Sequence, residues 1–413
     1  MTTNTQLKTT TTVKSTPGLG IGGTPSLWFI LFAIMAAVGI YAAGTILVQG
    51  HSALASTNAV PWNIFVSAYL FFVVIASGIC IVSSLGHLLG LEQFETIAWR
   101  AITHTTDSGR RERLRPEVIG LRAVTLSIII LLVGMAGILL DIGRPLMMIN
   151  MLLSPNLTSP MFWMGAAYSI YVLFLILEFF AIRRGDHKAV LRWATLSLIT
   201  AFFALGTLGA LFGMLYSKPM WFGAFTPIYM VATAIVSGLA VLSLFIIMSY
   251  QATGSKMPSS VAHVVSELGK VQIFALLGLI FMVFWRIISY FYGSNPDQLM
   301  MISGDYAFSF WTFEVIAGLV IPLVILANKS TRTQTGIIVA SALIVIGMFA
   351  ARTNFVIGGQ LIRPFEQPIA IYTPTTLENM YVIGLFGFAG VLYMLANKYL
   401  NFEKYEQGYN HER

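Results

Sequence analysis

Long apolar stretches follow one another along the chain, separated by shorter polar segments. Ten of them run approximately over 26–48, 62–90, 118–140, 160–182, 189–215, 226–250, 262–292, 306–327, 333–352 and 376–398. An α-helix needs about 20 mostly apolar residues to cross the hydrocarbon core of a bilayer. None of the stretches shows the alternation of polar and apolar positions that a membrane β-barrel requires. The pattern therefore predicts an all-α polytopic membrane protein with about ten transmembrane helices.

Two short sequence words recur at similar separations in the two halves of the chain. Ser77-Gly78 returns as Ser237-Gly238 after 160 residues, and Phe162-Trp163 returns as Phe310-Trp311 after 148 residues. Because four predicted helices separate the copies, the repeats have parallel topology. The words predict two four-helix bundles, helices 2–5 and 6–9, flanked by helices 1 and 10. In residue numbers, a single membrane domain over 26–398 contains repeat one at about 62–215 and repeat two at about 226–352.

The composition narrows the class of protein further. Hydrophobic residues make up 57% of the 413 positions and charged residues only 10%, whereas a soluble domain carries about 25% charged residues. This excludes a soluble enzyme, a nucleic-acid-binding domain and a disordered chain. The single cysteine, Cys80, excludes a disulfide framework and any zinc or iron–sulfur site built from this chain alone.

The distribution of basic residues predicts the orientation of the chain. Of the 24 Lys and Arg residues, 17 fall in the amino tail, the loops after helices 2, 4, 6 and 8, the carboxyl tail, or the helix ends that adjoin them. The opposite loops hold four: Arg144, Lys218, Arg352 and Arg363. Cytoplasmic loops carry the excess of positive charge, so both tails, 1–25 and 399–413, are predicted to be cytoplasmic. The net charge of +7 is then an orientation signal.

The predicted outer loops are rich in Pro, Trp and Tyr. They cover 141–160, 216–226, 293–305 and 352–375. They are either simple connectors or an ordered surface that docks another protein, and their composition favours docking.

Charged and titratable residues inside membrane helices are costly and often mark a pathway or a site. The candidates here are His87, Asp141, Arg144, Glu178, Glu267, Arg286 and Glu314. At about 1.5 Å of rise per residue, Glu314 and Arg286 lie at similar depths below the outer boundary and are predicted to pair. Asp141 and Arg144 fall at the same outer level, so one outer polar cluster is expected. His87, Glu178 and Glu267 lie nearer the inner face.

Each candidate also has a structural interpretation. Asp141 and Arg144 can cap the third helix, with Pro145 ending it. Arg286 and Glu314 can form an ion pair that only holds helices together. Glu178 and Glu267 can reach the inner headgroups, and His87 can be a packing residue.

Bound haem b is disfavoured. It needs two membrane histidines at matching depth, and only His87 and His263 of the six histidines could match. Because His263 begins its helix, it is expected to be in water. No metal of the chain's own is predicted.

Several motifs resemble those of the NrfD/polysulfide-reductase family of membrane subunits, in its long ten-helix branch. They are the stretch 141–145 (DIGRP), the stretch 154–163 (SPNLTSPMFW), the positions from Val60-Pro61-Trp62 to Gly86-His87, and Thr226-Pro227-Ile228-Tyr229 with the following Ser237-Gly238. The resemblance covers roughly 61–375.

The resemblance implies a membrane anchor for an iron–sulfur ferredoxin-like subunit on the outer face, alongside a molybdoenzyme, a hydrogenase or a multihaem cytochrome c. It also implies a site for menaquinone or ubiquinone near that face, in a prokaryotic cytoplasmic membrane. Asp141 and Arg144 correspond to signature positions beside the quinone, and His87 to a polar position linked to proton transfer or quinone binding.

We therefore expect a quinone-interacting subunit of a respiratory oxidoreductase. A quinone head group takes up two electrons and two protons, which requires donors and an acid. The expected catalytic residues are His87, Asp141 and Arg144. Tyr168, Arg286 and Glu314 join Asp141 and Arg144 as quinone-binding residues, and His87, Glu178 and Glu267 as a proton path. The alternatives are a secondary transporter, which the helix number and repeat would suit, and a structural anchor without a quinone site.

Overall fold

A computed structural model describes residues 26–58, 60–89, 117–143, 145–293, 296–361, 372–402 and 406. Ten long helical spans run through this part of the chain, and no strand occurs in it. They are α1 (Leu27–Gln49), α2 (Ile64–Leu89), α4 (Glu117–Leu139), α6 (Pro160–Arg184), α7 (His187–Gly213), α8 (Phe225–Thr253), α9 (Ser259–Tyr292), η4 continued by α11 (Ser309–Val320, Ile321–Ala327), α12 (Gln334–Thr353) and α14 (Thr376–Leu400). The predicted class and the ten spans are confirmed.

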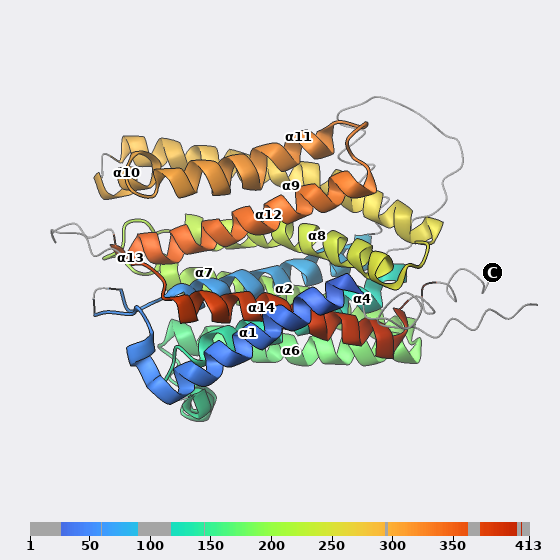
Figure 1. Ribbon diagram of the computed structural model, residues 1–413, viewed down its shortest axis with the longest axis horizontal. Coiled ribbons are helices and arrows are strands. Elements are labelled where there is room, and N and C mark those ends of the chain that lie inside the picture. The colour runs from blue at the N-terminus through green and yellow to red at the C-terminus, as the bar shows by residue number, and fades with distance from the viewer. Residues whose placement is uncertain are drawn as a thin grey trace, which may run out of the picture.

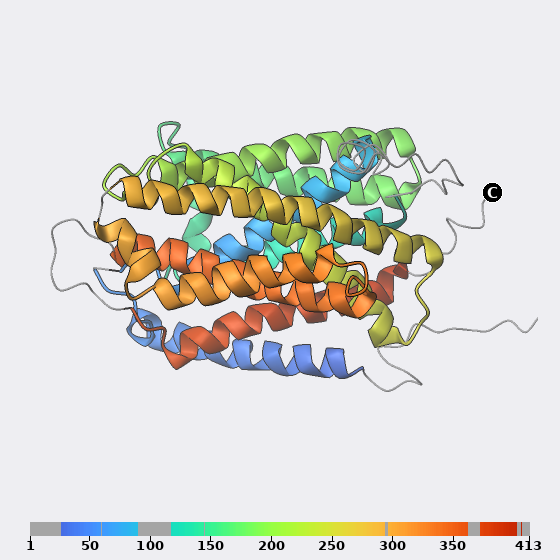
Figure 2. The same ribbon diagram turned by 90° about the horizontal axis from the view of Figure 1, so that it is seen from above.

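The long helices lie side by side, and the chain reverses at each end of the assembly (Figure 1, Figure 2). Because α4 begins near Arg122 and finishes near Asp141, we call the two ends the Arg122 end and the Asp141 end. Most of the short elements belong to the Asp141 end: η2 (Gly50–Ala53), η3 (Pro145–Ile149), α5 (Asn150–Leu153), α10 (Pro296–Ser303), η5 (Asn354–Gly358) and α13 (Gly359–Leu361). The predicted outer loops over 293–305 and 352–375 are thus partly helical.

Helix α2 lies at the centre of the assembly. It contacts α4, α7, α8, α12 and α14, and every residue in its most apolar window is buried, against 22% in α1 and in α9. In a membrane the exposed apolar faces of α1 and α9 can meet lipid at no cost, whereas α2 must pack against protein on all sides.

The two Ser-Gly words of the repeat meet where α2 crosses α8. A Cβ added to Gly238 would lie 2.4 Å from the backbone carbon of Gly78, so only glycine permits this approach. Ser77 and Ser237 each donate a hydrogen bond to the carbonyl four residues earlier. The two copies of the Ser-Gly word are therefore in direct contact with each other at the crossing of α2 and α8.

The Phe-Trp words also have matching surroundings. The Trp163 indole donates to the Leu157 carbonyl and the Trp311 indole to the Ile302 carbonyl, each at 2.9 Å. Consecutive helices touch within each predicted group, α2–α4–α6–α7 and α8–α9–α11–α12, and α1 pairs with α14, but α2 and α7 also pack extensively on α8 of the other group. The division into two bundles remains a prediction.

Glycines let α14 approach its neighbour α1 closely. Gly384 packs on Gly39, Gly387 on the Met35–Ala36 backbone and Gly390 on the Phe32 ring, all on α1. Small residues at such crossings allow the van der Waals contact that holds membrane helices together.

Candidate functional site

Asp141 lies just beyond the end of α4 and is held from α2. The Asn63 side-chain amide donates to Asp141 Oδ1 at 2.8 Å and to Ser56 Oγ at 3.0 Å. Asn63 Oδ1 in turn accepts the backbone N–H of Phe65 at 2.8 Å, which caps the first turn of α2. The start of α2 and the end of α4 are therefore joined through one buried amide.

The residues after Asp141 fix the shape of this loop. His51 Nε2 lies 2.9 Å from the Asp141 carbonyl oxygen. Gly143 has φ +71°, and a Cβ there would lie 2.6 Å from the His51 ring. Only glycine combines this backbone conformation with that space, which gives the glycine of the 141–145 motif a physical role.

The Asp141 carboxyl has an unusual affinity for protons. Burial raises its pKa to about 6, although the His51 charge and the Asn63 hydrogen bond oppose the shift, and the Glu378 carboxylate adds to it. A carboxyl with this pKa can accept or release a proton near neutral pH.

A second polar cluster lies between α8, α9, η4 and α12. Arg286 of α9 and Glu314 of η4 form an ion pair, as their depths predicted. The Tyr229 hydroxyl donates to Glu314 Oε1 at 3.3 Å, and its ring stacks under the Arg286 guanidinium, 5.0 Å from the centroid. Glu314 is 2% exposed, so the pair satisfies a charge that could not otherwise remain buried.

Glu314 sits in a widened stretch of helix. η4 and η5 are both π-helical, a geometry often found at functional positions. Asn354 of η5 donates to Glu314 Oε2 at 3.2 Å and accepts from Ser309 of η4 at 2.8 Å. The two π-helical segments of the described chain therefore meet at this carboxylate.

Arg352 lies in α12 and is 2% exposed, so its assignment to an outer loop is wrong. Its guanidinium donates to Thr233 Oγ1 and to Met230 Sδ and interacts electrostatically with Glu314 and Tyr168. Hydropathy alone could not find this residue, because Arg352 stands at the end of the apolar run where a loop was expected.

The single outer cluster expected from depth is two clusters in the structure. Asp141 contacts α2 and the η2 region, whereas Arg286 and Glu314 contact α8 and α12, and no described hydrogen bond joins the two sets. Tyr168 of α6 is buried and its hydroxyl has no partner among the described residues. The sequence predicted one cluster because residue number gives the depth of a side chain along its helix. It does not give the position of that helix among its neighbours.

The two inner glutamates differ in their surroundings. Glu178 of α6 is 1% exposed and neither carboxylate oxygen has a hydrogen-bond partner in the described chain; Ser197 of α7 faces it. Glu267 of α9 pairs with Lys270 at 2.6 Å and has His263, which is 45% exposed, at 3.8 Å. Of these two glutamates, only Glu178 is thus buried without compensation.

The side chains of two predicted site residues lie outside the described part of the structure. Arg144 lies outside the described residues, and His87 lies in α2 but its side chain is outside the described part. Among the described residues no three His, Cys, Asp or Glu side chains group as a metal site would need, and the absence of a metal stays a prediction. Sequence reasoning did not select Asn63, Asn354 or Tyr229 as site residues, although Tyr229 belongs to a quoted motif.

Comparison with known proteins gives a family match over most of the chain. The family model described as "Polysulphide reductase, NrfD" matches residues 52–364. This range includes Asp141, Glu178, Arg286, Glu314 and Arg352, whereas His51 lies one residue before it.

Three relatives align along nearly their whole length. A selenate reductase subunit of Mesobacillus selenatarsenatis is 22% identical, over 90% of this chain and 92% of the relative. The Hdr-like menaquinol oxidoreductase integral membrane subunit of Archaeoglobus fulgidus is 25% identical, over 89% and 91%. A putative dimethyl sulfoxide reductase membrane subunit of Halobacterium salinarum is 23% identical, over 91% of each chain.

Proposed function

This chain belongs to the NrfD polysulphide reductase family, and we propose that it is the quinone-interacting membrane subunit of a respiratory oxidoreductase complex. Two of the relatives are named as membrane subunits, one of a menaquinol oxidoreductase and one putatively of a dimethyl sulfoxide reductase, and the third is named as a subunit of selenate reductase. The proposed role is to exchange electrons between an iron–sulfur subunit and the menaquinone or ubiquinone pool.

One observation carries the proposal: just beyond the end of α4, a buried amide holds a partly buried carboxyl whose pKa burial raises to about 6. A quinone head group needs a proton donor or acceptor and hydrogen-bond donors at its carbonyls, within an apolar pocket for its tail. Asp141 supplies the titratable group. The amide of Asn63 fixes the orientation of that group, and His51 stands beside it as a second titratable residue.

The remaining predicted residues complete the proposal. Arg144, the signature neighbour of Asp141, would stabilise negative charge that develops on the head group. Arg286 and Glu314 belong to the second cluster, and we assign their ion pair to helix packing. Tyr168 stays a quinone-binding candidate, because its buried hydroxyl has no hydrogen-bond partner among the described residues.

Electrons must pass between the quinone and a partner subunit, because a chain with the single cysteine Cys80 cannot by itself supply the thiolates that hold an iron–sulfur cluster. We propose that an iron–sulfur ferredoxin-like subunit docks at the Asp141 end, accompanied by a molybdoenzyme, a hydrogenase or a multihaem cytochrome c. Exposed aromatic side chains are found there: Tyr216, Phe222, Tyr292 and Phe308. With both tails cytoplasmic, this end faces the outside of a prokaryotic cytoplasmic membrane.

Proton exchange with the opposite side, as release during quinol oxidation or uptake during quinone reduction, would make turnover move charge across the membrane. We propose Glu178 as the principal group on that route, with His87 and Glu267 nearer the surface. Glu178 is a buried carboxyl whose oxygens have no hydrogen-bond partner among the described residues, which leaves them available to pass a proton on.

The decisive experiment is purification of the tagged chain in mild detergent from the native host. The proposal expects an iron–sulfur subunit to copurify and reduced menaquinone or ubiquinone to reduce that subunit. An intact complex without any quinol reactivity would support a structural anchor instead. A chain that purifies alone and moves a solute in sealed vesicles would support a secondary transporter.

A further inference from the structure

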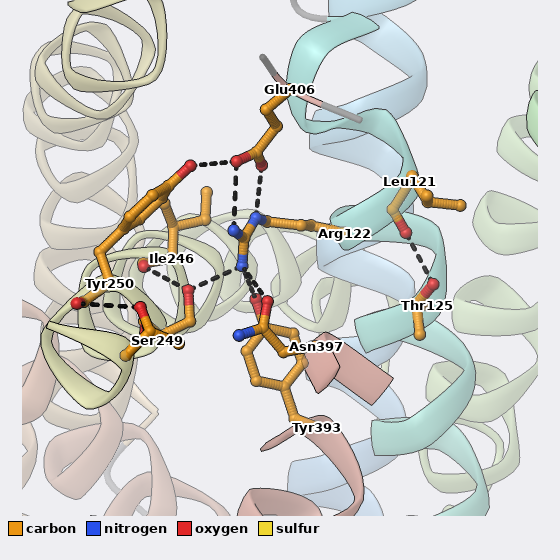
Figure 3. A network of polar contacts seen from close by, with 10 residues as sticks. Leu121, Arg122, Thr125, Ile246, Ser249, Tyr250, Tyr393, Asn397 and Glu406 are labelled. Atoms are coloured by element: carbon orange, nitrogen blue, oxygen red, sulfur yellow. Dashed lines mark hydrogen bonds and ion pairs between the residues drawn. The ribbon is translucent and has the colours of Figure 1, made fainter. Parts of the chain in front are cut away.

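Arg122 is buried at the end of the molecule opposite to Asp141. It lies in the second turn of α4 and is 1% exposed. Because an arginine stays charged at any pH that proteins tolerate, its guanidinium requires an anion or a full set of acceptors in the interior. Figure 3 shows that it has both.

The anion comes from beyond the end of α14. Glu406 is fully buried and faces Arg122 with both carboxylate oxygens: Nε donates to Oε1 and Nη2 donates to Oε2 at 3.1 Å (Figure 3). This is the two-pronged geometry in which arginine binds carboxylates most strongly. The Tyr250 hydroxyl of α8 donates to Oε2 as well.

The remaining donor of Arg122 is satisfied by the other walls of the site. Nη1 donates to Ser249 Oγ of α8 at 2.7 Å, and to Tyr393 Oη and Asn397 Oδ1 of α14 at 3.2 Å each. The rings of Tyr250 and Phe402 lie 5.0 and 5.1 Å from the guanidinium carbon. Three helices thus form a polar, aromatic-walled site around one carboxylate.

We infer that the Arg122 end contains a carboxylate-binding site, built by α4, α8 and α14, that the chain fills with its own Glu406. Ser249, Tyr393 and Asn397 hold Arg122 through Nη1, separately from the two nitrogens that face Glu406. The ligand class of the site is a carboxylate, since Nε and Nη2 together take both oxygens of the Glu406 carboxylate in the two-pronged geometry.

Occupation of the site joins parts of the molecule that otherwise touch little. Apart from this junction α4 and α8 make few contacts, and Glu406 binds Arg122 of α4 and Tyr250 of α8 together. At their far ends these helices lead to Asp141 and Tyr229. Glu406 therefore acts as a strap that fixes how the two helices stand relative to each other.

The strap can be tested on the purified full-length chain by thermal unfolding in detergent. Glu406→Gln keeps the shape of the side chain but removes the charge, and is expected to lower the unfolding midpoint by roughly 5 °C or more. Asp305→Asn, which removes an exposed carboxylate at the other end, serves as the matched control and is expected to change it little. An unchanged midpoint in Glu406→Gln would overturn the inference.

Chemical rescue separates a carboxylate site from a merely structural side chain. Glu406→Ala leaves space beside Arg122, and about 100 mM sodium acetate is expected to restore part of the lost midpoint by binding the folded state. Sodium chloride at the same ionic strength is the control. Equal effects of the two salts would contradict the assignment.

A smaller change keeps the test usable if Glu406→Ala does not accumulate. Tyr250→Phe removes one donor to the carboxylate and is expected to lower the midpoint by a few degrees, and less when combined with Glu406→Gln than the separate effects predict. Full additivity would show that the two residues do not share a site. None of these measurements involves a quinone, so their outcome is independent of the proposed function.

Discussion

The side-chain amide of Asn354 donates a hydrogen bond to Glu314 Oε2 at 3.2 Å and so connects the two π-helical segments of the described chain. The other carboxylate oxygen of Glu314, Oε1, forms an ion pair with the Arg286 guanidinium. A buried carboxylate that bridges three helices can be a structural element or part of a reaction path, and substitutions of the pair distinguish these roles.

Glu314→Ala is expected to destabilise the chain by roughly 3–5 kcal/mol, because it leaves the Arg286 charge buried and unpaired. The double variant Arg286→Met/Glu314→Leu removes both charges and is expected to recover most of that loss. Thermal unfolding measures the recovery. If the double variant also regains quinol turnover, the pair is structural as we propose; recovered stability without turnover would assign it to the reaction.

Asp141→Asn is expected to abolish quinol oxidation while the complex still assembles. The amide keeps the size of the side chain but cannot exchange a proton. Turnover is measured with a soluble menaquinol analogue, and assembly by copurification of the partner subunits. Asp305→Asn is the matched control, and normal turnover in Asp141→Asn would remove Asp141 from the site.

The pKa of Asp141 predicts two pH effects. Since the folded-state pKa of about 6 lies above the usual value of about 3.9, the native chain holds the proton more tightly, and stability is expected to fall as pH rises from about 4 to 6. The loss should amount to roughly 1–2 kcal/mol after allowance for partial exposure, measured as the difference between wild type and Asp141→Asn. Quinol oxidation should increase at somewhat higher pH, from about 5 to 7 and centred on the folded-state pKa of about 6, because the ionised carboxylate accepts the proton. A flat difference curve would contradict the assigned pKa.

Gly143→Ala is expected to destabilise the Asp141 loop for two reasons: the positive φ of this position and a steric clash with His51. Its Cβ would meet the His51 ring at 2.6 Å. Gly185, at the end of α6, has nearly the same φ, +70°, but open space around it. We expect Gly185→Ala to cost about 1 kcal/mol and Gly143→Ala to cost more and to lower quinol turnover. Equal effects of the two substitutions on stability and turnover would show that the His51 contact is unimportant.

Glu178→Gln is expected to leave electron transfer intact and to reduce charge movement in sealed vesicles. Because neither carboxylate oxygen has a partner among the described residues, the amide should fit without disturbing the packing. The membrane potential is followed with a voltage-sensitive dye during quinol oxidation, with Glu267→Gln for comparison. Unchanged charge movement would exclude Glu178 from a proton path.

The candidate site was only partly predictable from sequence. Depth along a helix is encoded in residue number, so the pairing of Arg286 with Glu314 could be foreseen. Asn63 could not be linked to Asp141 from the sequence. The two residues are 78 positions apart, and the hydropathy pattern does not show which helices are neighbours in the bundle. Arg352 was mistaken for a loop residue, since a charge at the end of an apolar run ordinarily marks the boundary of a helix.

The sequence by itself determined that this is a ten-helix membrane protein, because each crossing of a bilayer demands its own run of about 20 apolar residues. Tertiary structure alone decided which polar groups share a cluster. In a bilayer a leucine is equally suited to face lipid or another helix. The hydropathy of the sequence therefore does not show which side of a helix packs against its neighbours. Specific contacts decide which faces pack together. Examples are the close approach of Gly78 to Gly238 and the ion pair between Glu406 and Arg122.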